Sequence, residues 1–312
     1  MSTVDLRNHL AAGGHALFDL RGRAKFTLTG ADRVRYLNGQ VSNDVRRLDA
    51  GVGGAALPAC VMNAKGKMNG FVWISAGPDL LRIDADPGAD LEEFREAFAA
   101  RLERYIISDD ATLTDTTEEL QLLHLIGVTP DQLGSLPSGV EWHPAKRYGV
   151  EGFDLIAPAG PVEPTGSDLA ALALPGNLLR VDAATEDVFR IEQGIPRWGA
   201  ELNENTLPAE AGLDANSIDF HKGCYIGQEV ISRIKSVGRV NRHLCGFLAG
   251  EPLEAGTPVR DGEKEVGVIT SAAWSFALDK AVALGYLKRG IESPRLTAGS
   301  TEVEVRGLPL ID

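Results

Sequence analysis

Two kinds of hydrophobic spacing alternate along the first 240 residues. Short apolar runs, alternating or continuous, predict strands at 16–19, 25–29, 60–64, 71–76, 80–84, 112–114, 120–126 and 153–157. Apolar residues three or four positions apart predict helices that begin near Asp32, Asp90, Asp168 and Asp182 or Thr185. The short turn at 21–23 predicts that the first two strands form a hairpin. Together these elements predict an α+β fold, with helices layered against antiparallel sheet.

The pattern changes after residue 240. Short apolar runs at 243–248, 258–260, 266–271, 282–287 and 303–305 are separated by glycine-rich turns. Such spacing predicts a small antiparallel barrel. We therefore expect two units: residues 1–240, which contain the α+β part, and residues 241–312, which form a C-terminal β-barrel domain.

The charge balance narrows the classes of partner. The chain has 31 Lys and Arg against 44 Asp and Glu, a formal net charge of -13. This balance argues against broad binding of nucleic acid or of an anionic membrane, because both need clustered cations, although a local basic patch stays possible. No apolar run approaches the length of a membrane span.

The cysteines indicate the compartment. Cys60, Cys224 and Cys245 lie far apart and form no C-x-x-C pair, so neither a disulfide framework nor a zinc site is indicated, and we predict no metal ligands. This usage suits a reducing compartment. The first residues show no signal-peptide pattern, so we expect a cytoplasmic protein.

The segment 219–233 concentrates reactive and charged groups near a predicted helix. The helix is predicted to follow Gly227, because apolar residues recur at helical spacing: Ile226, Val230, Ile234 and Val237. Cys224 comes just before this helix, whose unpaired N–H groups would favour a thiolate, and Lys222 adds positive charge. Cys224 is therefore a candidate reactive thiol. The alternative is an inert, buried cysteine in a tight turn.

Residues 222–229, Lys-Gly-Cys-Tyr-Ile-Gly-Gln-Glu, resemble the K-G-C-Y-x-G-Q-E signature of the YgfZ family, folate-binding relatives of the glycine cleavage T-protein, an aminomethyltransferase. Residues 64–68 resemble the early lysine-glycine hairpin of that family, and residues 190–196 resemble its R-x-E-x-G-x-P stretch. The resemblance implies a T-protein-like three-part ring: two intertwined, ferredoxin-like α+β subdomains and a C-terminal antiparallel β-barrel. It also implies tetrahydrofolate as the cofactor, bound where the three parts meet.

The resemblance points to residues for this folate site. Arg190 would hold a ligand carboxylate in a forked hydrogen bond, or else neutralise carbonyls at a helix end. Glu192 would accept hydrogen bonds from the pterin, or else be a solvated charge. Because folate is anionic, an acidic protein needs local cations to bind it. The predicted folate-binding residues are Asn63, Lys65, Arg190, Glu192, Lys222 and Tyr225, and Cys224 is predicted to face the same cavity as the catalytic group.

One departure from the T-protein pattern bears on activity. The T-protein has an aspartate just after its glycine turn, which the resemblance implies acts on the folate nitrogen. Here the equivalent positions are Gly70 and Phe71. Without that carboxylate, aminomethyl transfer lacks its proton-handling group, so we expect a relative that is not an aminomethyltransferase.

Three functions stay open from the sequence. The resemblance favours a tetrahydrofolate-binding accessory protein that supports assembly or repair of iron–sulfur enzymes, and thereby tRNA modification. Its partners would then be those enzymes or their assembly proteins, and Cys224 would be redox-active or would accept a one-carbon unit. The alternative is a folate-dependent aminomethyltransferase or demethylase acting on a small amine. The third is an interaction module that has lost the ligand.

Overall fold

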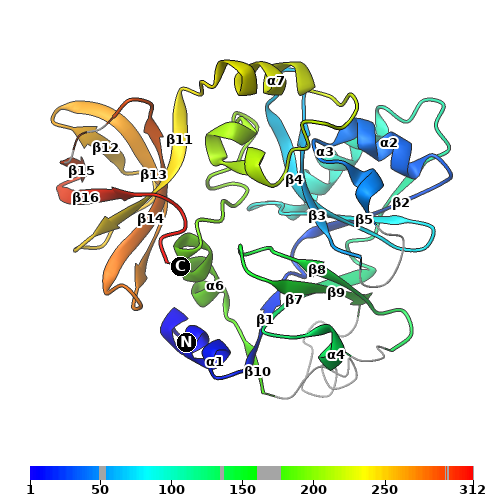
Figure 1. The fold of residues 1–312 in the computed structure, drawn as a ribbon, viewed down its shortest axis with the longest axis horizontal. Coiled ribbons are helices and arrows are strands. Elements are labelled where there is room, and N and C mark those ends of the chain that lie inside the picture. The colour runs from blue at the N-terminus through cyan, green and yellow to red at the C-terminus, as the bar shows by residue number, and fades with distance from the viewer. Residues whose placement is uncertain (49–53, 134–136, 160–176, 292, 294, 312) are drawn as a thin grey trace.

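The protein has three parts, two sheets and a barrel (Figure 1). The computed structural model describes residues 1–312 except 49–53, 134–136, 160–176, 292, 294 and 312. Helices flank the sheets, and the barrel is made from the C-terminal end of the chain (Figure 1). The predicted α+β fold with a C-terminal antiparallel barrel is confirmed. The helix predicted near Asp168 lies outside the described residues.

The first sheet is mixed. Its order is β10-β1-β7-β9-β8, with β10 parallel to β1 and the other neighbours antiparallel. The strands are β10 (Leu178–Arg180), β1 (His15–Asp19), β7 (Leu120–Ile126), β9 (Gly152–Pro158) and β8 (Glu141–Ala145). The buried positions of β7 and β9 form its apolar core, so residues far apart in the chain meet in one sheet.

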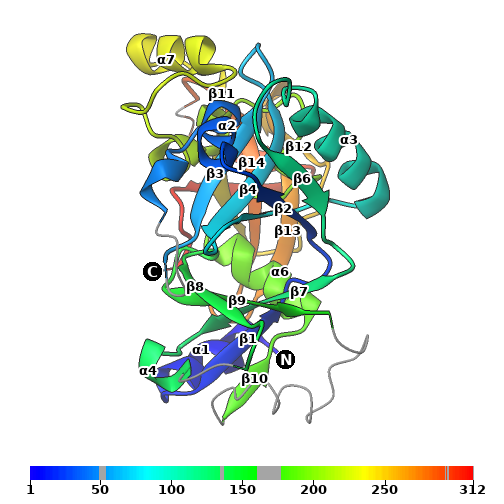
Figure 2. The ribbon, with the colours of Figure 1, turned by 90° about the vertical axis from the view of Figure 1, so that its right-hand side faces the viewer.

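The second sheet is antiparallel and has the order β3-β4-β5-β2-β6. Its strands are β3 (Leu57–Met62), β4 (Met68–Ala76), β5 (Leu81–Ala85), β2 (Ala24–Thr29) and β6 (Thr112–Asp115). The predicted hairpin of the first two strands is wrong, because β1 pairs in the first sheet and β2 in the second. The chain crosses between sheets at residues 20–23, and this crossing intertwines the two subdomains (Figure 2).

The barrel closes in the order β11-β14-β13-β12-β15-β16. Its strands are β11 (Arg242–Ala249), β14 (Lys280–Lys288), β13 (Lys264–Ser275), β12 (Pro258–Asp261), β15 (Leu296–Ala298) and β16 (Thr301–Arg306). Side chains that alternate along these strands fill the interior, among them Phe247, Val259, Ile269 and Val303. Closure satisfies the backbone groups that would otherwise be exposed at sheet edges.

Helices pack around the two sheets and the barrel. The helices are α1 (Thr3–Ala11), α2 (Arg33–Gln40), α3 (Leu91–Glu103), α4 (Pro130–Leu133), α6 (Ala183–Glu192) and α7 (Gln228–Val237), with 3-10 turns η1 (Val45–Arg47), η2 (Pro208–Ala211) and η3 (Leu213–Ala215). Asp90 and Asp182 cap α3 and α6 as predicted, each accepting a backbone N–H three residues on. Asp32 precedes α2 as predicted, but its side chain makes no capping hydrogen bond to that helix. Buried residues of α2 and α3, such as Leu37 and Phe98, pack on the second sheet.

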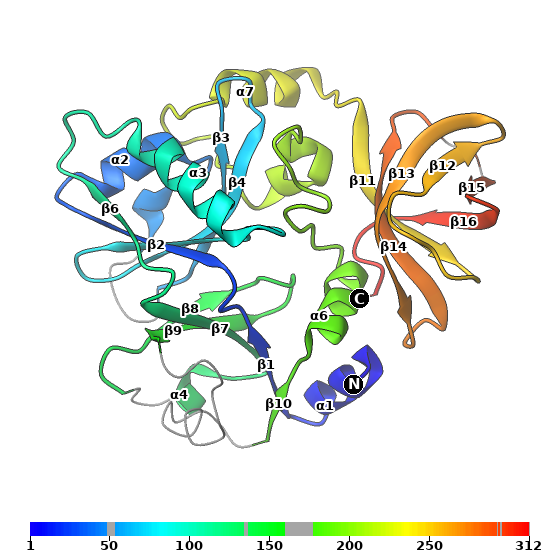
Figure 3. The same ribbon diagram turned by 180° about the vertical axis from the view of Figure 1, so that it is seen from behind.

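Helix α6 joins the first sheet to the barrel. It lies between β1 and β14 when the molecule is seen from either side (Figures 1 and 3). Ile191 of α6 is fully buried and packs with Val282 and Leu284 of β14, and Leu308 from the chain end packs against the same cluster. The barrel is therefore fixed to the α+β part through an apolar contact as well as through the polar contacts described below.

Candidate functional site

A cavity of about 470 Å³ lies where the second sheet, the β8–β9 turn and the loops after α6 meet. Its size falls within the range of small-ligand pockets, roughly 300–1,000 Å³. The lining is formed by Ala55, Ala56, Pro58, Phe71, Trp73, Pro144, Ala145, Lys146, Arg147, Gly149, Glu151, Ile195, Pro196, Gly212, Leu213, Asn216 and Ser217.

Two aromatic side chains form one wall of this cavity. Phe71 and Trp73 are two positions apart on β4, so the pleat directs both to the same face of the strand. Phe71 is half-buried and Trp73 is buried. A flat aromatic ligand could pack on such a wall, since aromatic pairs stack or meet edge to face.

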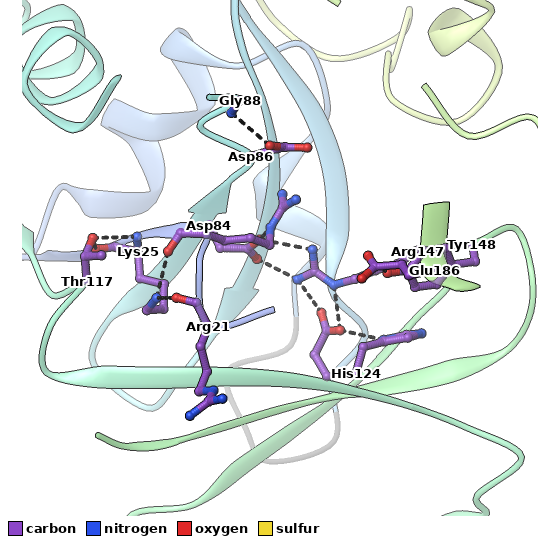
Figure 4. Close-up of polar contacts among 12 residues, drawn as sticks. Arg21, Lys25, Asp84, Asp86, Gly88, Thr117, His124, Arg147, Tyr148 and Glu186 are labelled. Carbon is purple, nitrogen blue, oxygen red and sulfur yellow. Dashed lines mark hydrogen bonds and ion pairs between the residues drawn. The ribbon is translucent and has the colours of Figure 1, made fainter. Parts of the chain in front are cut away.

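Arg147 lies at the base of the cavity and is almost completely buried. Its Nε and Nη2 donate to Asp154 at 2.7 Å. Its Nη1 and Nη2 donate to Asp84 at 3.0 and 2.6 Å (Figure 4). Burial opposes its charge, but Asp154 and Asp84 outweigh this effect and hold the pKa of Arg147 above its usual range. The guanidinium also lies 5.1 Å from the centre of the Trp73 ring, so it supports the aromatic wall.

His124 and Asp154 continue this network into the first sheet. Nδ1 of His124 lies 2.8 Å from Asp154, and the imidazole is fully buried. Burial lowers the pKa of His124 and outweighs the opposing effect of Asp154, so we assign a neutral ring that donates from Nδ1. Its Nε2 has no hydrogen-bond partner among the described residues.

The same network ties the two sheets together. Asp84 belongs to β5 of the second sheet, whereas His124 and Asp154 belong to β7 and β9 of the first. Arg23, in the crossing segment, donates from its Nε to Asp84. Burial would raise the pKa of Asp154, but Arg147 and His124 hold it well below the usual range. The inter-sheet network, defined here as Arg23, Asp84, His124, Arg147 and Asp154, therefore keeps its charges and fixes the base of the cavity.

Arg190 lies elsewhere, in the contact between α6 and the barrel. It is buried, with Nε donating to Asp187 at 2.6 Å, Nη1 to Glu201 at 3.0 Å and Nη2 to Ser271 of β13 at 2.7 Å. Glu201 is itself fully buried and also accepts from the Ser271 hydroxyl. The side chain thus holds α6 against the barrel.

Glu192, two residues after Arg190 in α6, is completely buried. Its Oε1 accepts from the Thr3 and Ser275 hydroxyls at 2.8 and 2.7 Å, and its Oε2 accepts from Arg7 at 3.0 Å. These contacts join α1, α6 and β13. We call Thr3, Arg7, Arg190, Glu192, Glu201, Ser271 and Ser275 the α6–barrel network.

Lys222 is buried under the signature loop. Its Nζ donates to the carbonyl oxygens of Asn38, Val41 and Asn43 at 2.6–2.7 Å, at the end of α2. It also lies 5.2 Å from the centre of the Tyr225 ring. Burial lowers the pKa of Lys222 to about 8 and raises that of Tyr225 to about 12. Both residues therefore anchor the loop that carries Cys224.

Cys224 is exposed, whereas Cys60 and Cys245 are buried. Burial raises the pKa of Cys60 and of Cys245 to about 12, which leaves those two thiols protonated and inert. Cys224 precedes α7 by four residues, with Gly227 between them in the left-handed region at φ 89°. The exposed thiol is therefore Cys224, the residue that the sequence analysis predicts as the candidate reactive cysteine.

Asn63 and Lys65 form the turn between β3 and β4. The Asn63 side chain accepts the backbone N–H of Lys65 at 2.9 Å and of Lys67 at 3.2 Å, so it stabilises the turn. A Cβ on Gly227 would come within 2.8 Å of the Asn63 carbonyl, so the turn packs directly on the signature loop. The structure therefore brings Asn63 and Lys65 next to the signature loop.

None of the seven predicted site residues, all within the described chain, lines the 470 Å³ cavity. Arg190 and Glu192 lie in the α6–barrel contact, and the other five gather around the signature loop; contact of any of them with folate stays a prediction. Sequence reasoning missed Trp73 and Arg147. The alternation of Phe71 and Trp73 on one strand was the available signal for the wall.

The comparisons with known proteins agree with this architecture. Residues 242–310 match the profile of the glycine cleavage T-protein C-terminal barrel domain. An aminomethyltransferase of Rubrobacter xylanophilus is 28% identical over 315 residues, covering 94% of this chain and 80% of the relative. A putative chloroplastic transferase of Arabidopsis thaliana is 28% identical over 298 residues, covering 88% of this chain and 66% of the relative.

The whole fold is also similar to a solved structure. The glycine cleavage system aminomethyltransferase T from Bartonella henselae matches with a TM-score of 0.79 at 19% identity, over 98% of this chain and 89% of that one. The chain is similar to aminomethyltransferases over most of its length, in sequence and in fold. The predicted T-protein-like fold is thereby confirmed, whereas membership of the YgfZ family stays a prediction.

Two further observations concern the described residues. Among the described residues, no three His, Cys, Asp or Glu side chains lie in an arrangement that could hold a metal ion. No helix in the described ranges has both the length and the apolar character needed to cross a membrane. The lining of the cavity itself includes aromatic, amide and cationic side chains.

Proposed function

We propose that this protein binds a reduced folate in the 470 Å³ cavity and acts as an accessory protein in the assembly or repair of iron–sulfur enzymes, and thereby in tRNA modification. The observation that carries the proposal is that Phe71 lines the cavity. Gly70 and Phe71 are the positions at which the resemblance places the T-protein aspartate. An aromatic wall binds a pterin but moves no proton. The proposal therefore separates folate binding from aminomethyl transfer.

The chemistry of the lining fits tetrahydrofolate. Phe71 and Trp73 would pack against the flat ring, and the Asn216 and Ser217 segment offers polar groups for its edge. Lys146, at the rim, would face the carboxylates of the glutamate tail. Bound folate supplies a carrier for a one-carbon unit; the residues of this chain hold and orient it.

The lining lacks a free carboxylate for proton handling. Among the described lining residues the acidic side chain is Glu151, which is exposed and lies 2.5 Å from Lys146 in an ion pair. General acid–base catalysis needs a group within hydrogen-bond reach of the reacting atom. This supports folate binding without aminomethyl transfer at the cavity wall. Cys224, which lies outside the lining, is a separate candidate for a redox-active or one-carbon-accepting thiol.

The relatives named aminomethyltransferase favour a second candidate, one-carbon transfer from a small amine. Release of methylene-tetrahydrofolate from a panel of aminomethyl and N-methyl donors would support it. A carboxylate restored by Phe71→Asp should then raise the rate. If neither the wild type nor Phe71→Asp releases product, the transferase candidate fails.

Calorimetric titration with tetrahydrofolate under reducing, anaerobic conditions tests the cavity. We expect saturable binding that weakens by at least about tenfold in Phe71→Ala, because the ring loses its stacking partner. Phe276→Ala is the matched control, since Phe276 is exposed on the barrel. Equal affinity in the wild type and in Phe71→Ala, or no saturable binding, would rule out this cavity as the folate site.

The accessory role needs a separate test. A strain that lacks the native protein should lose activity of an iron–sulfur tRNA-modifying enzyme and recover it with the wild-type chain. We expect Phe71→Ala to restore less activity than Phe276→Ala. Cys224→Ser should also restore less if the thiol takes part, and full recovery with Cys224→Ser would exclude the thiol.

A further inference from the structure

Positive charge gathers around the signature loop of an otherwise acidic protein. Residues 63–68 and 219–239 together hold six Lys or Arg and two Asp or Glu, whereas the whole chain has a net charge of -13. The two segments are in contact, because a Cβ on Gly66 would lie 2.9 Å from Val230 of α7. Helix α7 lies across the tip of the β3–β4 hairpin (Figures 1 and 3). We call the exposed surface of these two segments the signature face.

The charges at the surface are mostly unneutralised. Lys222 is buried and serves the carbonyls of α2, and Asp219 pairs with Arg47 at 3.3 Å. The remaining cations of the signature face have no carboxylate within ion-pair distance in the described chain. Apart from Asp219, the acidic residue of the two segments is Glu229. These cations are Lys65, Lys67, Arg233, Lys235 and Arg239.

Apolar side chains lie among these cations. Phe220, Ile226 and Ile234 are each half-buried rather than covered, and Lys235 stacks 3.3 Å above the Phe220 ring. Exposed Cys224 lies within the same loop. Partly exposed apolar and aromatic groups ringed by charge are typical of protein–protein interfaces.

We propose that the signature face docks an acidic protein partner, which meets the cations with carboxylates and covers Phe220, Ile226 and Ile234 with apolar side chains. A nucleic acid fits less well, because the remaining surface of the chain would repel phosphates and because phosphate contacts leave apolar side chains uncovered. The inference depends on the surface alone and holds whether or not folate binds in the cavity.

The test uses three fluorescent probes: an acidic peptide with a central Leu-Phe pair, a polyglutamate of equal charge, and a single-stranded RNA of equal charge. We expect the Leu-Phe peptide to bind more tightly than polyglutamate, and both to bind more tightly than RNA. Affinity for the peptide should fall as salt rises, because interface charges are screened.

Charge reversal locates the binding. In Lys65→Glu/Arg233→Glu/Arg239→Glu we expect affinity for the peptide to fall by about tenfold or more. The matched control is Arg260→Glu/Lys264→Glu/Lys280→Glu, which reverses three exposed charges on the barrel. Circular dichroism and thermal unfolding confirm that both triple variants are folded. An equal loss in the two triple variants, preference for RNA, or no binding of the peptide would overturn the proposal.

Alkylation of Cys224 gives an independent measurement. The bound peptide should slow modification of this thiol in the wild type, because the partner covers the signature loop. Cys60 and Cys245 are buried and serve as unreactive internal references. Peptide binding that leaves the alkylation rate unchanged would place the contact elsewhere and contradict the proposal.

Discussion

The inter-sheet network and the α6–barrel network contain the same kinds of residue but differ in their surroundings. In the first, Arg147 bridges two carboxylates and lies beside Trp73, in the wall of the cavity. In the second, both oxygens of Glu192 are engaged by Thr3, Ser275 and Arg7, away from the cavity. Burial and charge are therefore common to both networks, and the position of Arg147 in the lining of the cavity distinguishes them.

The difference leads to four predictions, and the largest effect is expected for Arg147→Met. This change leaves Asp84 and Asp154 without their shared cation, so we expect the free energy of unfolding to fall by about 3–5 kcal/mol. Because Trp73 also loses its support, the folate affinity of the folded variant should fall. Urea denaturation and calorimetry measure the two effects. Unchanged folate affinity in folded Arg147→Met would show that Arg147 does not support folate binding, and that the two networks do not differ in this respect.

Arg190→Met is the matching change in the α6–barrel network. It leaves Glu201 buried without a charged partner, so we expect a loss of about 3 kcal/mol in the free energy of unfolding. Folate affinity should stay within about twofold of the wild type, because Arg190 lies outside the lining of the cavity. A large rise in the Kd for folate in folded Arg190→Met would instead support the sequence-based prediction that Arg190 binds folate.

The sequence predicted local structure better than it predicted the site. Asp90 and Asp182 were identified as helix caps because capping is a property of neighbouring residues. The turn at 21–23 gave no sign that β1 and β2 pair in different sheets, since pairing partners lie up to 163 positions away, as in His15 with Leu178. Strand β8 was missed because Pro144 and nearby glycines masked its pattern.

The same limit applies to the candidate site. The motif residues Arg190 and Glu192 were found by resemblance, but only the fold reveals that their partners come from α1 and the barrel. Trp73 and Arg147 meet across 74 positions of sequence, and no local pattern reports such a contact. The amino-acid composition was compatible with a local basic patch. The structure brings the two segments of the signature face, residues 63–68 and 219–239, into contact.

A smaller effect is expected for Thr3→Val, which keeps the shape of the side chain but removes one donor to Glu192. The free energy of unfolding should fall by about 1.5 kcal/mol, because the lost hydrogen bond is made to a buried carboxylate. Folate affinity should not change. A loss above about 3 kcal/mol would show that Glu192 depends on α1 more than a single hydrogen bond explains.

The smallest effect concerns pH and tests whether the inter-sheet network keeps its charges. The pKa of Asp154 is held below its unfolded value of about 3.9, so its ionised form stabilises the fold above that pH, and this contribution is lost as pH falls. The destabilisation caused by Asp154→Asn should therefore be about 1 kcal/mol smaller at about pH 3 than at pH 7. In an Arg147→Met background the difference between the two pH values should shrink, because Arg147 lowers the pKa of Asp154. A difference that persists without Arg147 would mean that His124 alone holds the carboxylate ionised, and that the cavity wall is not coupled to this charge.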